Sequence, residues 1–235
     1  MNNDELKRRF ATLTTPHVAD GCIRAGVEVR CAPSGVRALR PGMRLSGRVL
    51  PTRHAGSVDV FLEALESAEP GDVLLADNGN RQDESCIGDL MALECQAAGL
   101  DGIVIWGLHR DSVEILEIGI PLFSTGSLPT GPQRADERAP DALTAATVGD
   151  WQLTRDDLVL GDDDGVLFIP ADRAADILSH AEAIRDTETT QAVRIRGGVS
   201  LREQVHFAEF LARRETEPEL TLREHLRTVG GAIEV

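Results

Sequence analysis

Two short charged pairs stand out in the sequence because of what lies between them. Gly88-Asp89 and Arg110-Asp111 are separated by 20 residues, most of which are apolar or small. Carboxylates can hold a hard divalent cation, and a guanidinium group can stabilise negative charge that develops during a reaction. The two pairs therefore form a candidate reactive centre if the fold brings them together.

The residues between the two pairs predict a helix followed by a buried strand. Apolar and small residues recur at helical spacing across residues 90–98, and Gly99 is a natural helix stop. Ile103–Trp106 is a short unbroken apolar run, which is typical of a strand buried on both faces. A helix of about ten residues spans ~15 Å and a strand of about six spans ~20 Å, so the strand returns the chain to the edge where the helix began. We therefore expect the charged pairs to share one rim with the free N–H groups of the helix start.

A second buried strand is predicted upstream, at Val73–Ala76, and it leads into a polar loop with the sequence DNGNRQDES. Together with the following helix and strand it makes a βαβ unit, which is expected to be parallel and right-handed. Ligands bind such sheets outside the carboxyl ends of the strands, so Asp77-Asn78-Gly79 should face the same pocket. Asp83 and Glu84 add carboxylates to this loop and favour a divalent cation such as Mg²⁺.

The whole chain predicts an α/β domain over residues 1–196 and a helical C-terminal extension over residues 197–235. Expected helices cover residues 3–12, 57–65 (with Ser57 as cap), 112–118 and 171–196, and a further helix starts with Thr15 as N-cap and Pro16 at its first position and ends at Gly26. Expected strands cover residues 45–53, 121–124 and 165–169 and parts of 145–160. The extension contains two amphipathic segments, HFAEFLARRE and LTLREHLRTV, which we expect to pack on the domain or on a neighbouring subunit.

Composition excludes several classes of function. The chain has 235 residues, a formal net charge of -15 and a pI of about 4.8, and such an acidic surface repels phosphate backbones and anionic lipids. We expect no nucleic-acid or membrane partner, and because no apolar signal region precedes residue 10 we expect a cytoplasmic protein. Lys7 is the only lysine, so Schiff-base chemistry has almost no candidate. The four cysteines form no CxxC pair and are expected to be buried, reduced thiols.

Several other patterns have structural explanations. The run Asp162–Gly165 leads directly into an apolar segment, so a hairpin turn is favoured over a calcium loop. The sequence contains no GxGxxG, GxxxxGK or GxSxG motif. His17 and His54 could line the pocket, although structural or surface roles are favoured for all six histidines. A helix cap and a salt bridge at a strand–helix junction would also explain the two charged pairs.

The spacing of the two charged pairs resembles the signature of class II pyruvate aldolases of the 4-hydroxy-4-methyl-2-oxoglutarate aldolase type. That family also contains the regulator of ribonuclease E activity A. The resemblance covers roughly residues 10–195 and includes Thr14-Thr15, Val18-Ala19-Asp20 and the segments PGDVLLADNGNRQDE and DDDGVLFIP. Many members of a longer branch with a similar tail bear the older name demethylmenaquinone methyltransferase, yet no methyl-donor glycine motif is present here.

The resemblance implies roles for individual residues. Asp111 would bind Mg²⁺ or Mn²⁺ directly, and Asp89 would hold a water ligand of the metal. Arg110 would contact the keto oxygen of the substrate. The backbone N–H groups of Leu90 and Met91, which follow Gly88-Asp89, would hold the substrate carboxylate.

The resemblance also implies a fold, an assembly and an activity. The expected fold is a swivelling β/β/α sandwich, and the expected assembly is a homotrimer or a dimer of trimers with active sites at subunit interfaces. An acid from the adjacent subunit, either Glu188 or Glu203, would complete each site. The implied activity is retro-aldol cleavage of a 4-hydroxy-2-oxo acid to pyruvate, with oxaloacetate decarboxylation as a side activity. The alternative is a non-catalytic regulator that inhibits a ribonuclease by contacting the enzyme rather than RNA.

Overall fold

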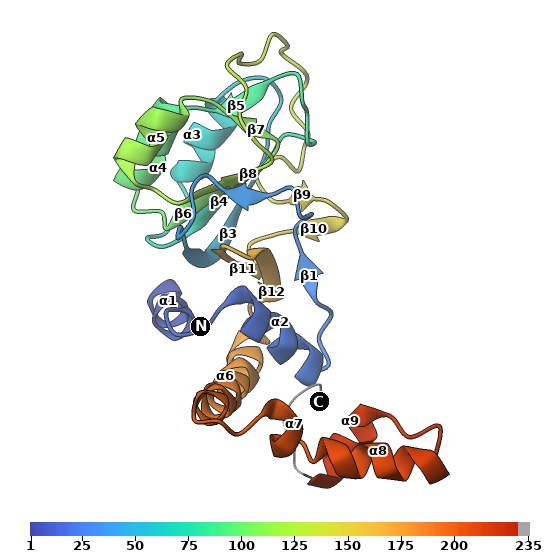
Figure 1. Cartoon of the computed structure of the whole chain (residues 1–235). Helices are drawn as coiled ribbons and strands as arrows, with labels where there is room; N and C mark the ends of the chain where they lie inside the picture. Colours follow the sequence, from blue (N-terminus) through green and yellow to red (C-terminus); the bar gives the residue numbers. More distant parts are fainter. Residues whose placement is uncertain (230–235) are drawn as a thin grey trace.

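The computed structural model describes residues 1–229, which fold around an eight-stranded mixed sheet (Figure 1). The strand order is β1-β12-β11-β3-β4-β6-β8-β2. These strands are β1 Arg30–Cys31, β2 Arg37–Ala38, β3 Leu45–Arg53, β4 Val73–Asp77, β6 Gly102–Trp106, β8 Leu122–Ser124, β11 Asp157–Asp162 and β12 Gly165–Pro170. Two short pairs lie outside this sheet: β5 Ser85–Ile87 with β7 Leu108–His109, and β9 Ala146–Val148 with β10 Trp151–Leu153.

The centre of the sheet is parallel, as predicted. β4 pairs in parallel with β3 on one side and with β6 on the other, and β6 continues in parallel to β8. Every residue of β4 and the first four residues of β6 are buried, because both faces of these strands are covered. Helix α4 (Asp89–Ala97) connects β4 to β6, which confirms the βαβ unit.

Helices cover the sheet in two separate groups (Figure 1). Helices α3 (Asp59–Leu65), α4 and α5 (Ser112–Ile118) lie over the parallel strands, and their apolar side chains form one aliphatic core with them. Helices α1 (Asn3–Phe10), α2 (Thr15–Arg24) and α6 (Ala174–Arg196) pack on β11 and β12 around a second core. On the face of β3, β4 and β6 opposite to α4, residues of β9–β12 form a third core. The three cores make a layered α/β fold, as predicted.

The Asp-rich run forms the predicted hairpin. The antiparallel register of β11 and β12 ends at the pair Asp162–Gly165, which leaves Asp163 and Asp164 as a two-residue loop. The buried Asp162 carboxylate accepts hydrogen bonds from the N–H and the hydroxyl of Thr15, both at 2.7 Å, and from the N–H of Asp164 at 3.1 Å. The carboxylate therefore ties α2 to the hairpin.

Three details of the predicted elements are wrong. Thr14, not Thr15, is the N-cap of α2, because Asp162 engages both the hydroxyl and the N–H of Thr15. Val58, not Ser57, is the N-cap residue of α3. The polar loop after β4 contains the additional strand β5, which is too short to produce a periodic pattern in the sequence.

The C-terminal extension contains three helices where two were predicted. They are α7 Leu201–Gln204, α8 Phe207–Thr216 and α9 Leu222–Val229, and the last six residues of the chain lie outside the described part. Val205, Phe210 and Leu226 are buried within the extension, and His225 Nε2 lies 3.0 Å from the Val205 carbonyl oxygen. Figure 1 shows the extension beyond the end of α6, away from the sheet. Its packing on the domain or on a neighbouring subunit stays a prediction.

Three of the four cysteines are buried free thiols, as predicted, but Cys31 is exposed. Burial raises the pKa of Cys22 to about 11 and that of Cys95 to about 12, so both remain protonated at neutral pH. Within residues 1–229, no helix has the length and apolar character needed to cross a membrane.

Candidate active site

The fold brings the two charged pairs together at the carboxyl edge of the parallel strands. Asp89 is the first residue of α4, and Asp111 is the N-cap of α5, just after β7. The Asp89 N–H donates to Asp111 Oδ2 at 3.3 Å, and Arg110 Nε lies 3.4 Å from the same oxygen. The Asp111 carboxylate thus meets both the Arg110 guanidinium and the backbone N–H of Asp89, which lies 22 residues earlier in the sequence, as the lengths of the helix and the strand predict.

The short strands β5 and β7 hold this arrangement in place. They pair in parallel, and the Arg110 N–H donates to the Ile87 carbonyl oxygen at 3.0 Å, directly before Gly88. Asp111 adopts the left-handed conformation with φ 59 and ψ 43, which is costly for a residue other than glycine. Such strain is found at sites where the fold imposes one direction on a side chain.

Gly88 permits the close approach of the two pairs. A Cβ atom at this position would lie 2.3 Å from Asp111 Oδ2 and 3.1 Å from Arg110 Nε. The backbone of Gly88 is extended, with φ -126 and ψ -168, so any residue could adopt its conformation. The requirement for glycine here is therefore one of space and not of backbone freedom.

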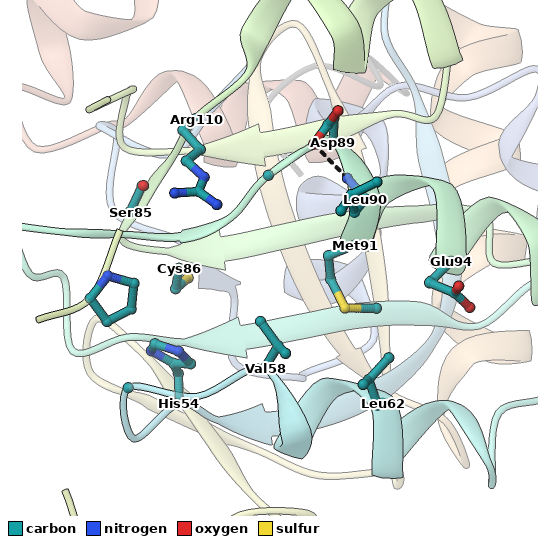
Figure 2. Close-up of a pocket in the computed structure, with 13 residues that line it drawn as sticks. His54, Val58, Leu62, Ser85, Cys86, Asp89, Leu90, Met91, Glu94 and Arg110 are labelled. Carbon is teal, nitrogen blue, oxygen red and sulfur yellow. Dashed lines mark hydrogen bonds between the residues drawn. The ribbon is translucent and has the colours of Figure 1, made fainter. Parts of the chain in front are cut away.

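A cavity of about 360 Å³ opens beside these residues. Its walls are mainly apolar, with Arg110 and Asp89 towards one end and Glu94 at the other (Figure 2). The lining residues are His54, Gly56, Val58, Leu62, Ser85, Cys86, Gly88, Asp89, Leu90, Met91, Glu94, Arg110 and Pro132. All the residues predicted to bind substrate are among them, whereas Asp111 lies behind Gly88.

The N-terminus of α4 is occupied by its own first side chain. Asp89 Oδ1 accepts a hydrogen bond from the Leu90 N–H at 2.8 Å (Figure 2). A carboxylate is favoured at this place because the first N–H groups of a helix lack partners and carry partial positive charge. The same N–H group could hold a substrate carboxylate only after the Asp89 side chain turns away.

A buried polar network forms the floor of the cavity around His54. His54 Nδ1 lies 2.9 Å from Asn78 Oδ1, which also accepts a hydrogen bond from Arg134 Nη2 at 3.0 Å. Arg134 can only donate, so the Asn78 atom that it contacts is the amide oxygen, which accepts. His54 Nδ1 therefore carries the proton that it donates to this oxygen, and Nε2 is left with a lone pair. Burial lowers the pKa of His54, and its buried Nε2 has no hydrogen-bond partner. The imidazole is therefore neutral at pH 7.

Arg134 belongs to the polar network behind the cavity, and the sequence did not reveal its position there. Its guanidinium donates to both oxygens of Glu84, with distances between 2.8 and 3.2 Å, and it also pairs with Asp136. The Glu84 hydrogen bonds raise the pKa of Arg134 further. Arg134 belongs to a Pro/Gly-rich loop without hydrophobic periodicity, so no signal in the sequence indicates where it lies.

Several other candidates from the sequence lie outside the site or serve the fold. Glu84 is buried and neutralised by Arg134, while Asp83 is exposed and pairs with Arg81, so neither joins the Asp89–Asp111 cluster. His17 Nε2 lies 3.1 Å from Glu188 Oε2, away from the cavity. His54 is the histidine that lines the cavity.

The second candidate for the acid of a neighbouring subunit, Glu203, forms a capping box with Ser200 at the start of α7. Neither Glu188 nor Glu203 lines the cavity of its own chain. Their assignment to the site of an adjacent subunit stays a prediction.

The carboxylates present fit a hydrated divalent cation. Within residues 1–229, no group of three or more acidic, histidine or cysteine side chains could enclose a metal ion. Asp89 and Asp111 supply two carboxylates at one rim, and Mg²⁺ commonly uses one or two carboxylates together with water and substrate oxygens. The donor set suits Mg²⁺ or Mn²⁺ and does not suit a closed tetrahedral zinc site.

Comparison with known proteins assigns this chain to a family. Residues 15–168 match the model of the RraA-like family, which is described as Aldolase/RraA. The match covers more than half of the chain, and the chain belongs to the RraA-like family. The family and the swivelling β/β/α fold predicted from the two charged pairs are therefore confirmed.

Individual relatives bear different kinds of name. The chain is 27% identical over 127 residues to the 4-hydroxy-4-methyl-2-oxoglutarate aldolase of Thermus thermophilus, a match that covers 54% of this chain and 76% of that protein. It is 26% identical over 211 residues to Protein DlpA of Legionella pneumophila, covering 83% of this chain but only 32% of the length of that protein. Streptomyces coelicolor RraAS2, described as an unusual member of the RNase ES inhibitor RraA protein family, superposes with a TM-score of 0.70 at 25% identity, covering 83% of this chain and 100% of that chain.

Proposed function

We propose that the chain is a divalent-metal-dependent lyase that cleaves a 4-hydroxy-2-oxo acid to release pyruvate. The observation that carries this proposal is the meeting of Asp89, Arg110 and Asp111 beside a cavity and a helix N-terminus. Carboxylates, a guanidinium and N–H groups at a helix N-terminus are the elements needed to bind a 2-oxo acid and to stabilise its enolate. The aldolase name of the Thermus thermophilus relative supports the same class of reaction.

Each residue has a separate task in this proposal. Asp111 would hold Mg²⁺ or Mn²⁺ and Asp89 would hold one of its water ligands, and the bound cation would supply Lewis acidity towards the oxo acid. Arg110 donates to the keto oxygen, where negative charge develops. The N–H groups of Leu90 and Met91 hold the substrate carboxylate once Asp89 has released Leu90. This exchange makes Asp89 a link between cation binding and substrate binding.

The reaction breaks the C3–C4 bond of the substrate. The C4 hydroxyl loses its proton to a base, the C4–O bond becomes a carbonyl, and the electron pair of the broken bond remains on C3 as the enolate of pyruvate. Arg110 stabilises the enolate oxygen until C3 is protonated and pyruvate leaves. Loss of CO₂ from oxaloacetate produces the same enolate, so we propose oxaloacetate decarboxylation as a side activity.

The proposed enzyme works in the cytoplasm as a homotrimer or hexamer. The chain is strongly acidic, which argues against nucleic-acid and anionic-membrane partners. The cavity is open, with the side chain of Arg110 47% exposed, and an adjacent subunit carrying Glu188 or Glu203 would complete it. Active sites at subunit interfaces would then depend on assembly.

A ribonuclease-inhibiting regulator is the second candidate function. It is favoured by the similarity to Streptomyces coelicolor RraAS2, all of whose chain is matched. A regulator that binds a protein has no need for two carboxylates and an arginine beside a cavity. The presence of that cluster in this chain is why we place the lyase first.

A pyruvate-release assay tests the proposal. Several 4-hydroxy-2-oxo acids are supplied with EDTA, with Mg²⁺ and with Mn²⁺, and pyruvate is measured with lactate dehydrogenase and NADH. We expect turnover that requires the cation and disappears in Asp111→Ala. If wild-type protein with either cation releases pyruvate no faster than Asp111→Ala from any of these acids, the lyase assignment is wrong, and inhibition of a ribonuclease by the purified protein becomes the better explanation.

A further inference from the structure

The end of the cavity opposite Arg110 carries no positive charge. Figure 2 shows Arg110 at one end and Glu94 at the other, with Val58, Leu62 and Met91 between them. Among the lining residues, Arg110 is the one cation, and Asp89 and Glu94 are both acidic. The far end therefore combines apolar walls with a carboxylate.

Cations near the cavity are already paired with acids of their own. Arg134 is engaged by Glu84 and Asp136, and neither its head group nor that of Arg81 lines the cavity. His54, the remaining basic side chain of the lining, is buried with its Nδ1 against Asn78 Oδ1, and burial lowers its pKa, so it adds no positive charge. Apart from Arg110, no cationic side chain of the described lining is available to pair with a second carboxylate.

The size of the cavity leaves room for more than the reacting end of a 2-oxo acid. Its volume of about 360 Å³ exceeds what pyruvate fills, and the additional space is bounded by aliphatic and thioether side chains. Val58 and Leu62 are 53% and 46% exposed, so in this chain alone much of their apolar surface faces solvent. An apolar group placed here would remove that surface from water, which is favourable.

We propose that the substrate of this chain is a 4-hydroxy-2-oxo acid whose far end is uncharged and aliphatic. This inference rests on the proposed lyase function and refines it. The Thermus thermophilus relative is named for 4-hydroxy-4-methyl-2-oxoglutarate, a dicarboxylate. A second carboxylate in this cavity would face Glu94 without a cation and would lose hydration against apolar walls, both of which oppose binding.

Binding of two matched, uncleavable acids tests the preference directly. 2-Oxoglutarate ends in a carboxylate and 5-methyl-2-oxohexanoate ends in an isopropyl group with the same number of heavy atoms, and both lack the 4-hydroxyl group needed for cleavage. By calorimetry with Mg²⁺ present, we expect the neutral acid to bind more tightly by roughly tenfold or more. Equal or tighter binding of 2-oxoglutarate, or no binding of either acid, would overturn the inference.

Two arginine variants locate the preference within the cavity. Leu62→Arg adds a cation to the far end and should shift the ratio of the two dissociation constants towards 2-oxoglutarate by roughly tenfold. Leu93→Arg is the matched control, because Leu93 is 45% exposed on α4 but does not line the cavity. If both variants change the ratio equally, the effect is one of net charge and the assignment of the far end is wrong.

Cleavage of the matched hydroxy acids separates this inference from the lyase proposal. 4-Hydroxy-2-oxoglutarate yields pyruvate and glyoxylate, and 4-hydroxy-5-methyl-2-oxohexanoate yields pyruvate and 2-methylpropanal. The ratio of their kcat/KM values should move towards the dicarboxylate in Leu62→Arg and not in Leu93→Arg. Failure to cleave either acid would refute the lyase proposal, whereas cleavage with a binding preference for 2-oxoglutarate would refute the substrate class alone.

Discussion

Replacing Gly88 with alanine should abolish most of the activity without unfolding the protein. The new Cβ atom would lie 2.3 Å from Asp111 Oδ2. Non-bonded carbon and oxygen atoms rarely come closer than about 3.3 Å, so this oxygen must move by about 1 Å. The movement would break the hydrogen bond from the Asp89 N–H, which is already long at 3.3 Å, and would turn the proposed metal ligand away from its place.

The two consequences of the substitution differ in size. A misplacement of about 1 Å in a catalytic group typically lowers the rate by about 10²-fold, which corresponds to about 2.7 kcal/mol of transition-state stabilisation. The folding cost is smaller, because the φ of Gly88 suits alanine and because the clashing atom is the end of a side chain. Exchange of glycine for alanine at an N-cap costs about 1 kcal/mol or less, which lowers the melting temperature of a chain of this size by about 2–4 °C.

Pyruvate release and calorimetric melting of the same preparation measure both quantities. Gly35→Ala is the control, because a Cβ atom at Gly35 would meet no atom within 4 Å. We expect the control to retain wild-type turnover and stability. Turnover of Gly88→Ala within about threefold of wild type would show that the position of Asp111 is not used in catalysis, and the site described here would then be wrong.

Four further predictions follow from the same structure. Arg110→Lys should lower turnover by about 10²–10³-fold while barely changing stability. The ion pair that it weakens, between Arg110 and Asp111, is solvent-exposed and worth at most about 1 kcal/mol. A lower melting temperature with near-normal turnover would instead identify a structural salt bridge. EDTA should abolish activity and Mg²⁺ or Mn²⁺ should restore it, whereas borohydride with pyruvate should leave Lys7 unlabelled in a mass spectrum. Burial lowers the pKa of both His54 and His109, so the folded state binds fewer protons than the unfolded state as pH falls below about 6.5. The stability that these two neutral histidines contribute is therefore complete above that pH and is lost on acidification. Urea titrations should show a smaller change in the free energy of unfolding between pH 7.5 and pH 5.5 for His54→Gln than for wild type. Light scattering at micromolar concentration should give at least three chains per particle, and a monomer would contradict the proposed interfacial site.

The centre of the fold could be predicted because its signals are local and its geometry is simple. Unbroken apolar runs identified β4 and β6, helical spacing identified α4, and the similar lengths of helix and strand placed Asp89 beside Asp111. The parallel pairing then followed from the crossover connection. These steps use only periodicity and chain geometry, which is why the resemblance to a family was not needed for them.

The missed parts of the site depend on contacts between distant segments. Strand β5 has three residues and its partner β7 has two, which is too short for any alternation to appear. Arg134 meets Glu84 across 50 residues through a loop whose path no local pattern determines. Both His17 and His54 were candidates to line the pocket, because the sequence pattern does not distinguish them. In the fold, His54 lines the cavity and His17 does not. Long-range packing decides such positions.

The separation of the C-terminal extension from the sheet has a consequence for spectroscopy. Trp106 and Trp151 are the two tryptophans of the chain, and both lie in the α/β domain, on β6 and β10. Intrinsic fluorescence therefore reports on the part of the molecule that carries the site. It does not report on the three C-terminal helices, Leu201–Gln204, Phe207–Thr216 and Leu222–Val229, which contain no tryptophan. The far-ultraviolet circular dichroism signal includes those helices, which bury Val205, Phe210 and Leu226. Fluorescence and circular dichroism can therefore follow different unfolding events.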